Sequence, residues 1–278
     1  MVEMGQQTCE VQSENTDSEV NWDEKPLLTR DHFHEEFSTE AYLKDFYTKV
    51  DDPAMQMVLT FLPGIAARLP DCESMLDFGA GPTIHASTCF RNRAKNIYLA
   101  DYLPQNRDEL QKWLDGRSTF DWTRVLRMIA AGEGIGWEKT KEMEEKTKSK
   151  IKGIFFCNCL EDPVLTAPDE LLGTFGVVVS IFTIEYCSMT TDEYRNAIRR
   201  VVELIRPGGY FILAGILEET WCSFGGRKFN CCYITRDFML QCLQDAGLII
   251  DLVNHQATVL FEVNGMFMIA AQKTRSDA

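Results

Sequence analysis

The stretch Met75-Leu76-Asp77-Phe78-Gly79-Ala80-Gly81-Pro82-Thr83 decides the fold of this chain. An apolar run ends in an acid and leads into a Gly-x-Gly turn, a pattern typical of a strand followed by a nucleotide-binding loop. Glycine lets the backbone turn this tightly and approach a ligand this closely. Dinucleotide-binding proteins carry a third glycine where Ile84 stands here. Because a Gly-x-Gly turn can also serve packing alone, other parts of the chain must support the interpretation.

A second acid supports ligand binding at this turn. Asp101 ends the next apolar run, residues 97–100. An acid that holds ribose hydroxyls lies about 20 residues beyond its glycine turn, which matches this position. Asp77 and Asp101 are therefore predicted to lie at adjacent strand ends, where two carboxylates suit a diol.

The composition is that of an acidic globular protein. The chain has 278 residues, 45% of them hydrophobic, and a formal net charge of −14. This length is sufficient for one α/β domain with a full core. A nucleic-acid surface would need clustered positive charge, so we expect no nucleic-acid partner and favour a cationic or neutral small substrate.

Cysteine usage and hydropathy bear on the compartment. Ten cysteines occur without an apolar signal segment at the N-terminus, and no run reaches the roughly 18 apolar residues of a membrane span. We therefore expect a cytosolic protein with no membrane span and no disulfide framework. The pairs Cys157/Cys159 and Cys231/Cys232 lack zinc-knuckle spacing, so we expect no metal site. Nothing resembles an apolar interface stripe, which favours a monomer.

Patterning divides the chain into a tail and a domain. Residues 1–30 are acidic and lack apolar periodicity, so they are predicted to form a disordered tail. Residues 31–275 are predicted to form a single domain. Apolar residues at helical spacing within residues 42–47 and 55–62 predict two helices before the first strand.

Strands and helices then alternate, as in a doubly wound α/β sheet. The segments 248–253 and 265–271 are predicted to pair as strands, and a terminal hairpin of this kind is typical of methyltransferases that use S-adenosylmethionine. The other strands are predicted at residues 74–78, 96–101, 152–157, 175–181 and 209–215, with helices at 137–152, 167–172, 192–204 and 235–246.

Four segments carry a resemblance to a known family. They are residues 76–83, Asp101-Tyr102 with Asn106, Phe120-Asp121-Trp122, and residues 204–209. The chain from about Phe37 to Lys273 resembles the nicotinamide, phenylethanolamine and indolethylamine N-methyltransferases. The resemblance implies a class I methyltransferase fold, which is Rossmann-like and doubly wound, ends in an antiparallel β-hairpin and carries added N-terminal helices. It also implies S-adenosyl-L-methionine as the methyl donor.

The resemblance further implies a set of cofactor-binding residues. Tyr42 and Tyr47 match two tyrosines of a helical lid that closes over the methionine end of the cofactor and expels water. Asp101 would hold the ribose hydroxyls, and Asn106 would reach the same end of the ligand. The full set is Tyr42, Tyr47, Gly79, Ala80, Gly81, Thr83, His85, Asp101, Asn106, Asn158, Cys159 and Ile181.

Two members of this set depart from the family pattern. His85 stands where relatives carry a tyrosine. Asn158 stands where they carry an aspartate that accepts a hydrogen bond from the adenine amino group, and Cys159 would give its backbone amide to the ring. Asparagine can still accept through its side-chain carbonyl, so these departures affect affinity more than binding itself.

Acidic residues near the acceptor would distinguish amines from pyridines. An aliphatic amine arrives as an ammonium ion and must lose a proton, whereas a pyridine nitrogen carries none. Glu185 and Glu219 match glutamates that lie beside the substrate amine in the phenylethanolamine enzyme, and Glu262 falls where that enzyme has an aspartate. The resemblance implies Glu185 and Glu219 as catalytic residues, Glu219 and Glu262 as substrate-binding residues, and three acids converging on one nitrogen.

The alternative acceptor is nicotinamide. The nicotinamide enzyme holds the carboxamide with an aspartate and serines, and Gly215, Glu219 and Cys231 stand at the matching positions. We therefore expect an S-adenosylmethionine-dependent N-methyltransferase acting on a small phenylethanolamine-like or arylalkylamine-like amine. A nicotinamide or other pyridine N-methyltransferase is the alternative. A non-catalytic cofactor-binding relative is more distant, and an oxidoreductase is disfavoured by the missing third glycine and the terminal hairpin.

Overall fold

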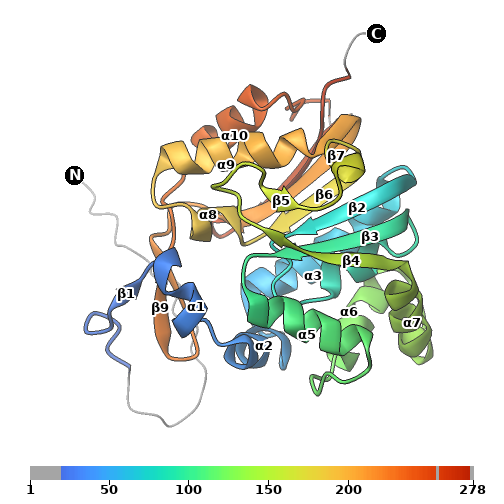
Figure 1. Cartoon of the computed structure of the whole chain (residues 1–278), viewed down its shortest axis with the longest axis horizontal. Helices are drawn as coiled ribbons and strands as arrows, with labels where there is room; N and C mark the ends of the chain where they lie inside the picture. The colour runs from blue at the N-terminus through green and yellow to red at the C-terminus, as the bar shows by residue number, and fades with distance from the viewer. Residues whose placement is uncertain (1–19, 255–256, 276–278) are drawn as a thin grey trace.

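An eight-stranded sheet organises the protein (Figure 1). The computed structural model describes residues 20–254 and 257–275. The strand order across the sheet is β10-β11-β7-β6-β2-β3-β4-β5. The strands are β2 (Cys72–Phe78), β3 (Ala94–Asp101), β4 (Ile151–Cys157), β5 (Leu165–Thr166), β6 (Phe175–Ile181), β7 (Ile205–Ile216), β10 (Thr258–Val263) and β11 (Met266–Gln272).

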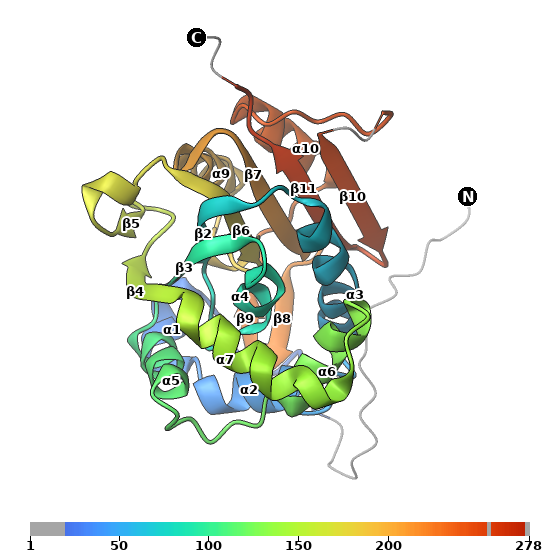
Figure 2. The ribbon, with the colours of Figure 1, turned by 90° about the vertical axis from the view of Figure 1, so that its right-hand side faces the viewer.

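The five inner strands, β4, β3, β2, β6 and β7, are parallel and confirm the strands predicted from the apolar runs. β11 is antiparallel to β7, and β10 is antiparallel to β11. This hairpin closes one end of the sheet, and β5 lies at the other (Figure 2). The chain order reverses between β2 and β6, which opens a crevice at the carboxyl ends of these strands.

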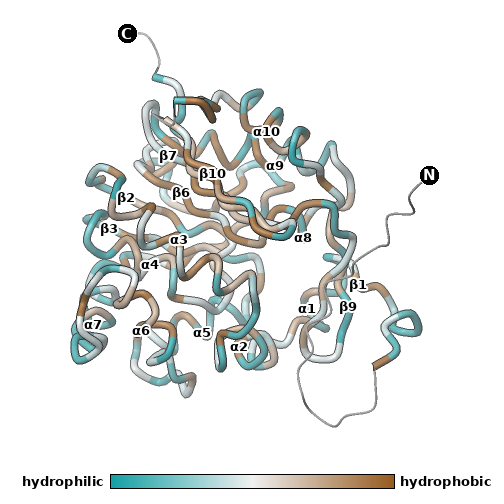
Figure 3. Tube along the Cα trace, turned by 180° about the vertical axis from the view of Figure 1, so that it is seen from behind, coloured by the Kyte–Doolittle hydropathy of each residue, from teal (hydrophilic) through white to brown (hydrophobic). Residues whose placement is uncertain are grey.

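Helices cover both faces of the sheet. One layer is formed by α3, α4, α5, α6 and α7, and α9 and α10 lie on the opposite face. Adjacent residues of the inner strands point to opposite cores: Met75 packs with the first layer and Leu76 with the second. The hydrophobic colour therefore concentrates along the inner strands (Figure 3), as expected for a parallel sheet buried on both faces.

Side-chain caps start four of the helices, namely α2, α3, α9 and α10. Asp52 precedes Pro53 at the start of α3, and its side chain accepts from the Met55 N–H at 3.0 Å. Thr190 caps α9 in the same way. The helices are α1 (Phe33–Glu36), α2 (Thr39–Tyr47), α3 (Pro53–Arg68), α4 (His85–Phe90), α5 (Pro104–Leu114), α6 (Thr123–Gly132), α7 (Thr140–Lys150), α8 (Ile184–Cys187), α9 (Thr191–Glu203) and α10 (Arg236–Asp245). Within the described ranges, no helix is both long and apolar enough to span a bilayer.

A small second sheet corrects the expected extent of the N-terminal tail. Residues 1–19 lie outside the described residues, but residues 20–30 carry structure. Strand β1 (Leu27–Leu28) pairs in parallel with β9 (Arg227–Asn230), which in turn pairs with β8 (Trp221–Phe224). Figure 1 shows β1, α1 and β9 side by side, away from the central sheet. Apolar periodicity missed this part because a two-residue strand has no period to detect.

The first strand of the terminal hairpin was predicted ten residues too early. Residues 248–253 do not form a strand, because the Asp251 side chain accepts from the backbone N–H groups of Val253 and Asn254 and closes a turn there. The partner of β11 is β10. Asn264 and Gly265 connect the two strands with φ angles of 49° and 81°, the positive values that a tight hairpin turn requires.

The helix predicted at residues 167–172 is reduced to one turn. Only Asp169–Leu171 are helical, as a 3₁₀ turn, and Pro168 precedes them. A single turn forms too few hydrogen bonds to offset the chain entropy that a longer helix would lose here. The remaining helix predictions are confirmed: residues 137–152 form a 3₁₀ turn (Trp137–Lys139) and α7, and α9 and α10 lie where they were expected.

Candidate active site

A cavity of about 1510 Å³ opens at the carboxyl ends of β2, β3 and β6. Small-ligand cavities typically measure about 300–1,000 Å³, so this one has room for a nucleoside-sized ligand and a second small molecule. All predicted cofactor residues line it: Tyr42, Tyr47, Gly79, Ala80, Gly81, Thr83, His85, Asp101, Asn106, Asn158, Cys159 and Ile181.

The glycine turn lies against the end of β3. Gly79 has a φ of 73°, and a Cβ there would lie 2.2 Å from Thr183 Cγ2, so no larger residue fits. Gly81 also has a positive φ, and its N–H donates to Asp101 Oδ2 at 2.8 Å. The turn and the acid at the end of β3 thus form one unit, and this contact fixes the orientation of the carboxylate.

Asp101 is held by a chain of hydrogen bonds that reaches helix α2. Its Oδ1 accepts from the Leu103 N–H at 2.9 Å and from Asn106 Nδ2 at 3.1 Å. Asn106 Oδ1 in turn accepts from the Thr39 hydroxyl at 2.8 Å. Asn106 therefore orients Asp101 and connects it to α2.

Asp77 brings a second carboxyl group to the same point. Its Oδ2 is buried and has no hydrogen-bond partner among the described residues. Burial, assisted by repulsion from Asp101, raises the pKa of Asp77 to about 8. Burial also raises the pKa of Asp101, opposed by its three N–H donors. A buried charge without a partner is costly, which is why the neutral form of Asp77 is favoured here.

The lid residues pack as a stack. The Tyr47 ring is buried and stacks on His85 with centroids 5.5 Å apart, and the Tyr42 ring lies 6.0 Å from Tyr47. Burial raises the pKa of both tyrosines and lowers that of His85 to about 4. Neither ring nitrogen of His85 has a hydrogen-bond partner among the described residues. The neutral imidazole is thus a second unsatisfied polar group in this cavity.

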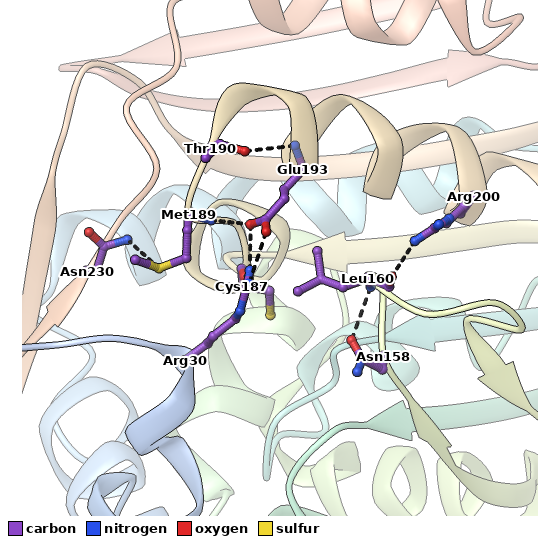
Figure 4. A network of polar contacts seen from close by, with 9 residues as sticks. All are labelled: Arg30, Asn158, Leu160, Cys187, Met189, Thr190, Glu193, Arg200 and Asn230. Carbon is purple, nitrogen blue, oxygen red and sulfur yellow. Dashed lines mark hydrogen bonds and ion pairs between the residues drawn. The ribbon is translucent and has the colours of Figure 1, made fainter.

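The loop after β4 forms another wall. Asn158 Oδ1 accepts from the Leu160 N–H at 3.1 Å, which engages one lone pair of the carbonyl predicted to meet adenine (Figure 4). Cys159 is buried beside the thiol of Cys187. Ile181 reaches the cavity from the end of β6.

The three predicted acceptor acids do not converge. Of the three, Glu219 alone lines the cavity. Glu262 lies outside it on β10, where both of its carboxylate oxygens accept from Arg236 Nε, at 2.9 and 3.0 Å. This position does not fit its expected role in substrate binding. The motif match placed Glu262 by sequence alone, and its position depends on the hairpin register.

Glu185 lies behind the cavity wall. Its side chain is 1% exposed, is not a lining residue, and has an Oε1 without a hydrogen-bond partner in the described chain. Burial raises the pKa of Glu185 to about 8. A Cβ on Gly215 would lie 2.8 Å from this oxygen, so the glycine gives the carboxyl group its space.

Several lining residues were not anticipated from the sequence. Val20, Asn21, Trp22 and Asp23 reach the cavity from the segment that was expected to be disordered. A bulky aromatic residue within an otherwise acidic stretch was the available signal.

The residues present fit S-adenosylmethionine. The half-buried turn at Gly79 and Gly81 leaves room for a ligand to approach the backbone. Asp101 follows this turn at the sequence separation typical of an acid that binds ribose. Asp77 Oδ2 and the two nitrogens of His85 supply unsatisfied polar atoms within the same cavity. Sheet order and site together define a class I S-adenosylmethionine-dependent methyltransferase.

Solved structures agree with this fold. The fold is similar to the CurJ carbon methyltransferase, with a TM-score of 0.55 and 13% identity over 86% of this chain and 60% of that one. It is also similar to the N-methyltransferase NodS from Bradyrhizobium japonicum in complex with S-adenosyl-l-homocysteine, with a TM-score of 0.51 and 14% identity over 84% of this chain and 95% of that one.

The chain belongs to the NNMT/PNMT/TEMT family, whose sequence model matches residues 24–274. It is 36% identical to a nicotinamide N-methyltransferase of Caenorhabditis elegans, over 87% of this chain and 91% of that protein. It is 27% identical to an indolethylamine N-methyltransferase of Oryctolagus cuniculus, over 80% and 86%. It is 26% identical to the phenylethanolamine N-methyltransferase of Homo sapiens, over 72% and 73%. These matches confirm an S-adenosylmethionine-dependent N-methyltransferase.

Proposed function

We propose that this N-methyltransferase acts on a small amine and that Glu219 handles the amine proton. The observation that carries the proposal is that Glu219 lines the cavity, which the aromatic residues Trp221 and Tyr186 also line. When bound, S-adenosylmethionine supplies a methyl group on a positively charged sulfur. The residues of this chain must then hold a nitrogen lone pair in line with that carbon.

A carboxylate at this position serves two needs of an amine. It attracts the ammonium form that predominates at neutral pH, and it accepts the proton that the nitrogen must lose before it attacks. Glu185 fits a supporting role, because its raised pKa keeps it protonated near neutral pH. Its neutral carboxyl group would then position the wall formed by β7.

The proposed cofactor contacts follow from the cavity geometry. Asp101, held by Gly81 and Asn106, would accept from the ribose hydroxyls. Tyr47 and His85 would cover the methionine end, and the loop at Asn158 would lie along the adenine. Each contact uses a group that already lines the cavity, so binding requires no rearrangement of the sheet.

Nicotinamide is the second candidate acceptor. It is favoured by the 36% identity to the nicotinamide N-methyltransferase of Caenorhabditis elegans. Against it, Gly215, Glu219 and Cys231 replace the polar set that is expected to hold a carboxamide. A pyridine nitrogen has no proton to lose, so its methylation does not need a carboxylate such as that of Glu219 as a proton acceptor.

Turnover of a small panel tests the acceptor. Wild-type protein, Glu219→Gln and the control Glu262→Gln are assayed at pH 7 with 2-phenylethylamine, tryptamine and nicotinamide. Glu219→Gln is expected to lower kcat/KM for the amines about 100-fold, and the loss should shrink at pH 10, where free amine is abundant. Wild-type preference for nicotinamide over every amine, or an unaffected Glu219→Gln, contradicts the proposal. Absence of all turnover with retained S-adenosylhomocysteine binding would favour a non-catalytic relative.

We also propose a cytosolic monomer. All nine cysteines in the described part of the chain are free thiols, which suits a reducing compartment. Sedimentation at micromolar concentration measures the oligomeric state, and a dimer would contradict this part of the proposal.

A further inference from the structure

Two tryptophans from distant parts of the chain meet at the cavity. The ring of Trp22 lies 5.8 Å from that of Trp221, with an angle of 36° between their planes. Both residues line the cavity. They are separated by nearly the whole domain in sequence, so their contact exists only in the folded protein.

Three interactions hold Trp22 in this place. Lys228 Nζ lies 4.4 Å from the centroid of the Trp221 ring and donates to the carbonyl oxygen of Trp22 at 3.4 Å. Strand β1 pairs with β9, where Leu27 stands opposite Lys228. Arg30 anchors the same segment to α9 through Glu193, as Figure 4 shows. The hydrogen bond from Lys228, the β1–β9 pairing and the Arg30 ion pair therefore together hold the segment of Trp22 in place.

The surroundings of this pair combine aromatic rings with acids. Phe33 and Phe229 line the cavity with rings 5.8 Å apart. Asp23 and Glu219 also line the cavity. In the sequence, Asp23 follows Trp22 directly and Glu219 lies two residues before Trp221. Flat apolar surfaces beside negative charge suit a ligand that has an aromatic ring and a positively charged nitrogen.

We propose that Trp22 is a specificity residue that recognises the aromatic ring of the methyl acceptor, together with Trp221. The proposal rests on the N-methyltransferase function given above and adds a residue of the N-terminal segment that selects the acceptor. An arylalkylamine places its ring on the tryptophans and its nitrogen toward Glu219. An alkylamine of similar length offers no flat surface and forgoes this contact.

Binding to protein saturated with S-adenosylhomocysteine tests the proposal by equilibrium dialysis. The probes are 2-phenylethylamine, hexylamine and nicotinamide, and the proteins are wild type, Trp22→Ala, Trp22→Phe and Trp137→Ala. Trp137 is 61% exposed, is not a lining residue of the cavity and serves as the matched control. Trp22→Ala is expected to weaken phenylethylamine binding about tenfold and to change hexylamine binding little. Trp22→Phe should restore most of the loss, and Trp137→Ala should bind as wild type does.

The outcomes separate this inference from the proposed function. Wild-type binding of nicotinamide but not of phenylethylamine contradicts the amine acceptor, while a loss of nicotinamide binding in Trp22→Ala still supports the aromatic contact. Unchanged binding of both aromatic probes in Trp22→Ala overturns the inference. It is also overturned by an equal loss for hexylamine, which indicates a general collapse of the segment, or by a wild-type protein that retains neither aromatic probe.

Discussion

Arg30 forms a two-point ion pair with Glu193, at 2.6 and 3.0 Å, and its Nη1 also donates to the carbonyl oxygen of Cys187 at 2.8 Å. Cys187 lines the cavity, and Glu193 also accepts from the Met189 N–H (Figure 4). One side chain of the N-terminal segment thus connects that segment to the wall of the site. A segment that carries Trp22 is thereby fixed to the sheet domain.

Breaking this pair should loosen the N-terminal segment. The two side chains are 27% and 33% exposed, so Arg30→Met is expected to lower the free energy of unfolding by about 1 kcal/mol. It should also increase proteolysis before residue 37 and raise the KM for the acceptor more than that for the cofactor. Urea denaturation, limited proteolysis and kinetics measure these effects. The control is Arg195→Met, which breaks an exposed pair with Asp245; equal behaviour of both variants would contradict the linking role.

Replacing the ribose-end acid should weaken cofactor binding. Asp101→Asn turns one acceptor oxygen into an NH₂ group that faces the N–H of Gly81 or of Leu103. The expected loss is about 10–100-fold in the Kd of S-adenosylhomocysteine, since hydrogen bonds to charged groups contribute roughly 1.5–3 kcal/mol. Calorimetry measures the change. Asp115→Asn, which alters an exposed carboxylate paired with Arg117, should bind as wild type does, and retained affinity in Asp101→Asn would refute the assignment.

A methyl group at the glycine turn should disrupt the site. Gly79→Ala combines a positive φ with a clash against Thr183, whereas Gly134→Ala has a similar φ of 69° and open space around its Cβ. The control should cost about 1 kcal/mol, from backbone strain alone. Gly79→Ala is expected to lose more stability and to abolish S-adenosylhomocysteine binding. Urea denaturation of the two variants separates the effect of the clash from that of backbone strain. Equal losses of unfolding free energy would show that the Thr183 side chain moves away from the added methyl group.

Glu185 should make stability depend on pH. Its pKa rises from 4.5 to about 8 on folding, so between these values the folded protein holds a proton that the unfolded chain has released. Stability from this group is complete below pH 4.5 and is lost as pH rises toward 8, at no more than about 1.4 kcal/mol per pH unit. Glu185→Gln should flatten the slope of unfolding free energy between pH 5 and 8. An unchanged slope would mean that Glu185 is already ionised when folded.

The apolar runs predicted the parallel strands because most of these strands are buried on both faces, and such burial is visible in the sequence without knowledge of the neighbouring strands. Gly79, Gly81 and Asp101 were predictable for a related reason: backbone geometry restricts which residues can occupy a tight turn and the strand end beside it. The hairpin was misplaced because residues 248–253 are as apolar as a strand. The turn signal Asn264-Gly265 was the better guide, since its positive φ angles permit few other residues.

The positions of the three predicted acceptor acids could not be predicted from the sequence. The sequence shows three glutamates, yet Glu185 is buried with a raised pKa, Glu219 lines the cavity and Glu262 pairs with Arg236. Their difference depends on the packing of β7 and on the register of β10 against β11. The spacing of the glutamates along the sequence reveals neither the packing of β7 nor the register of β10.

By itself the sequence determined the parallel inner strands and the glycine turn, because these depend on the burial of each strand and on local backbone geometry. Its resemblance to the N-methyltransferase family indicated the cofactor. Tertiary structure alone decided which of the three acids lines the cavity and that the ring of Trp22 packs against that of Trp221. Those relationships join segments up to about 200 residues apart, and such contacts form only when the loss of chain entropy is offset by packing of the whole fold.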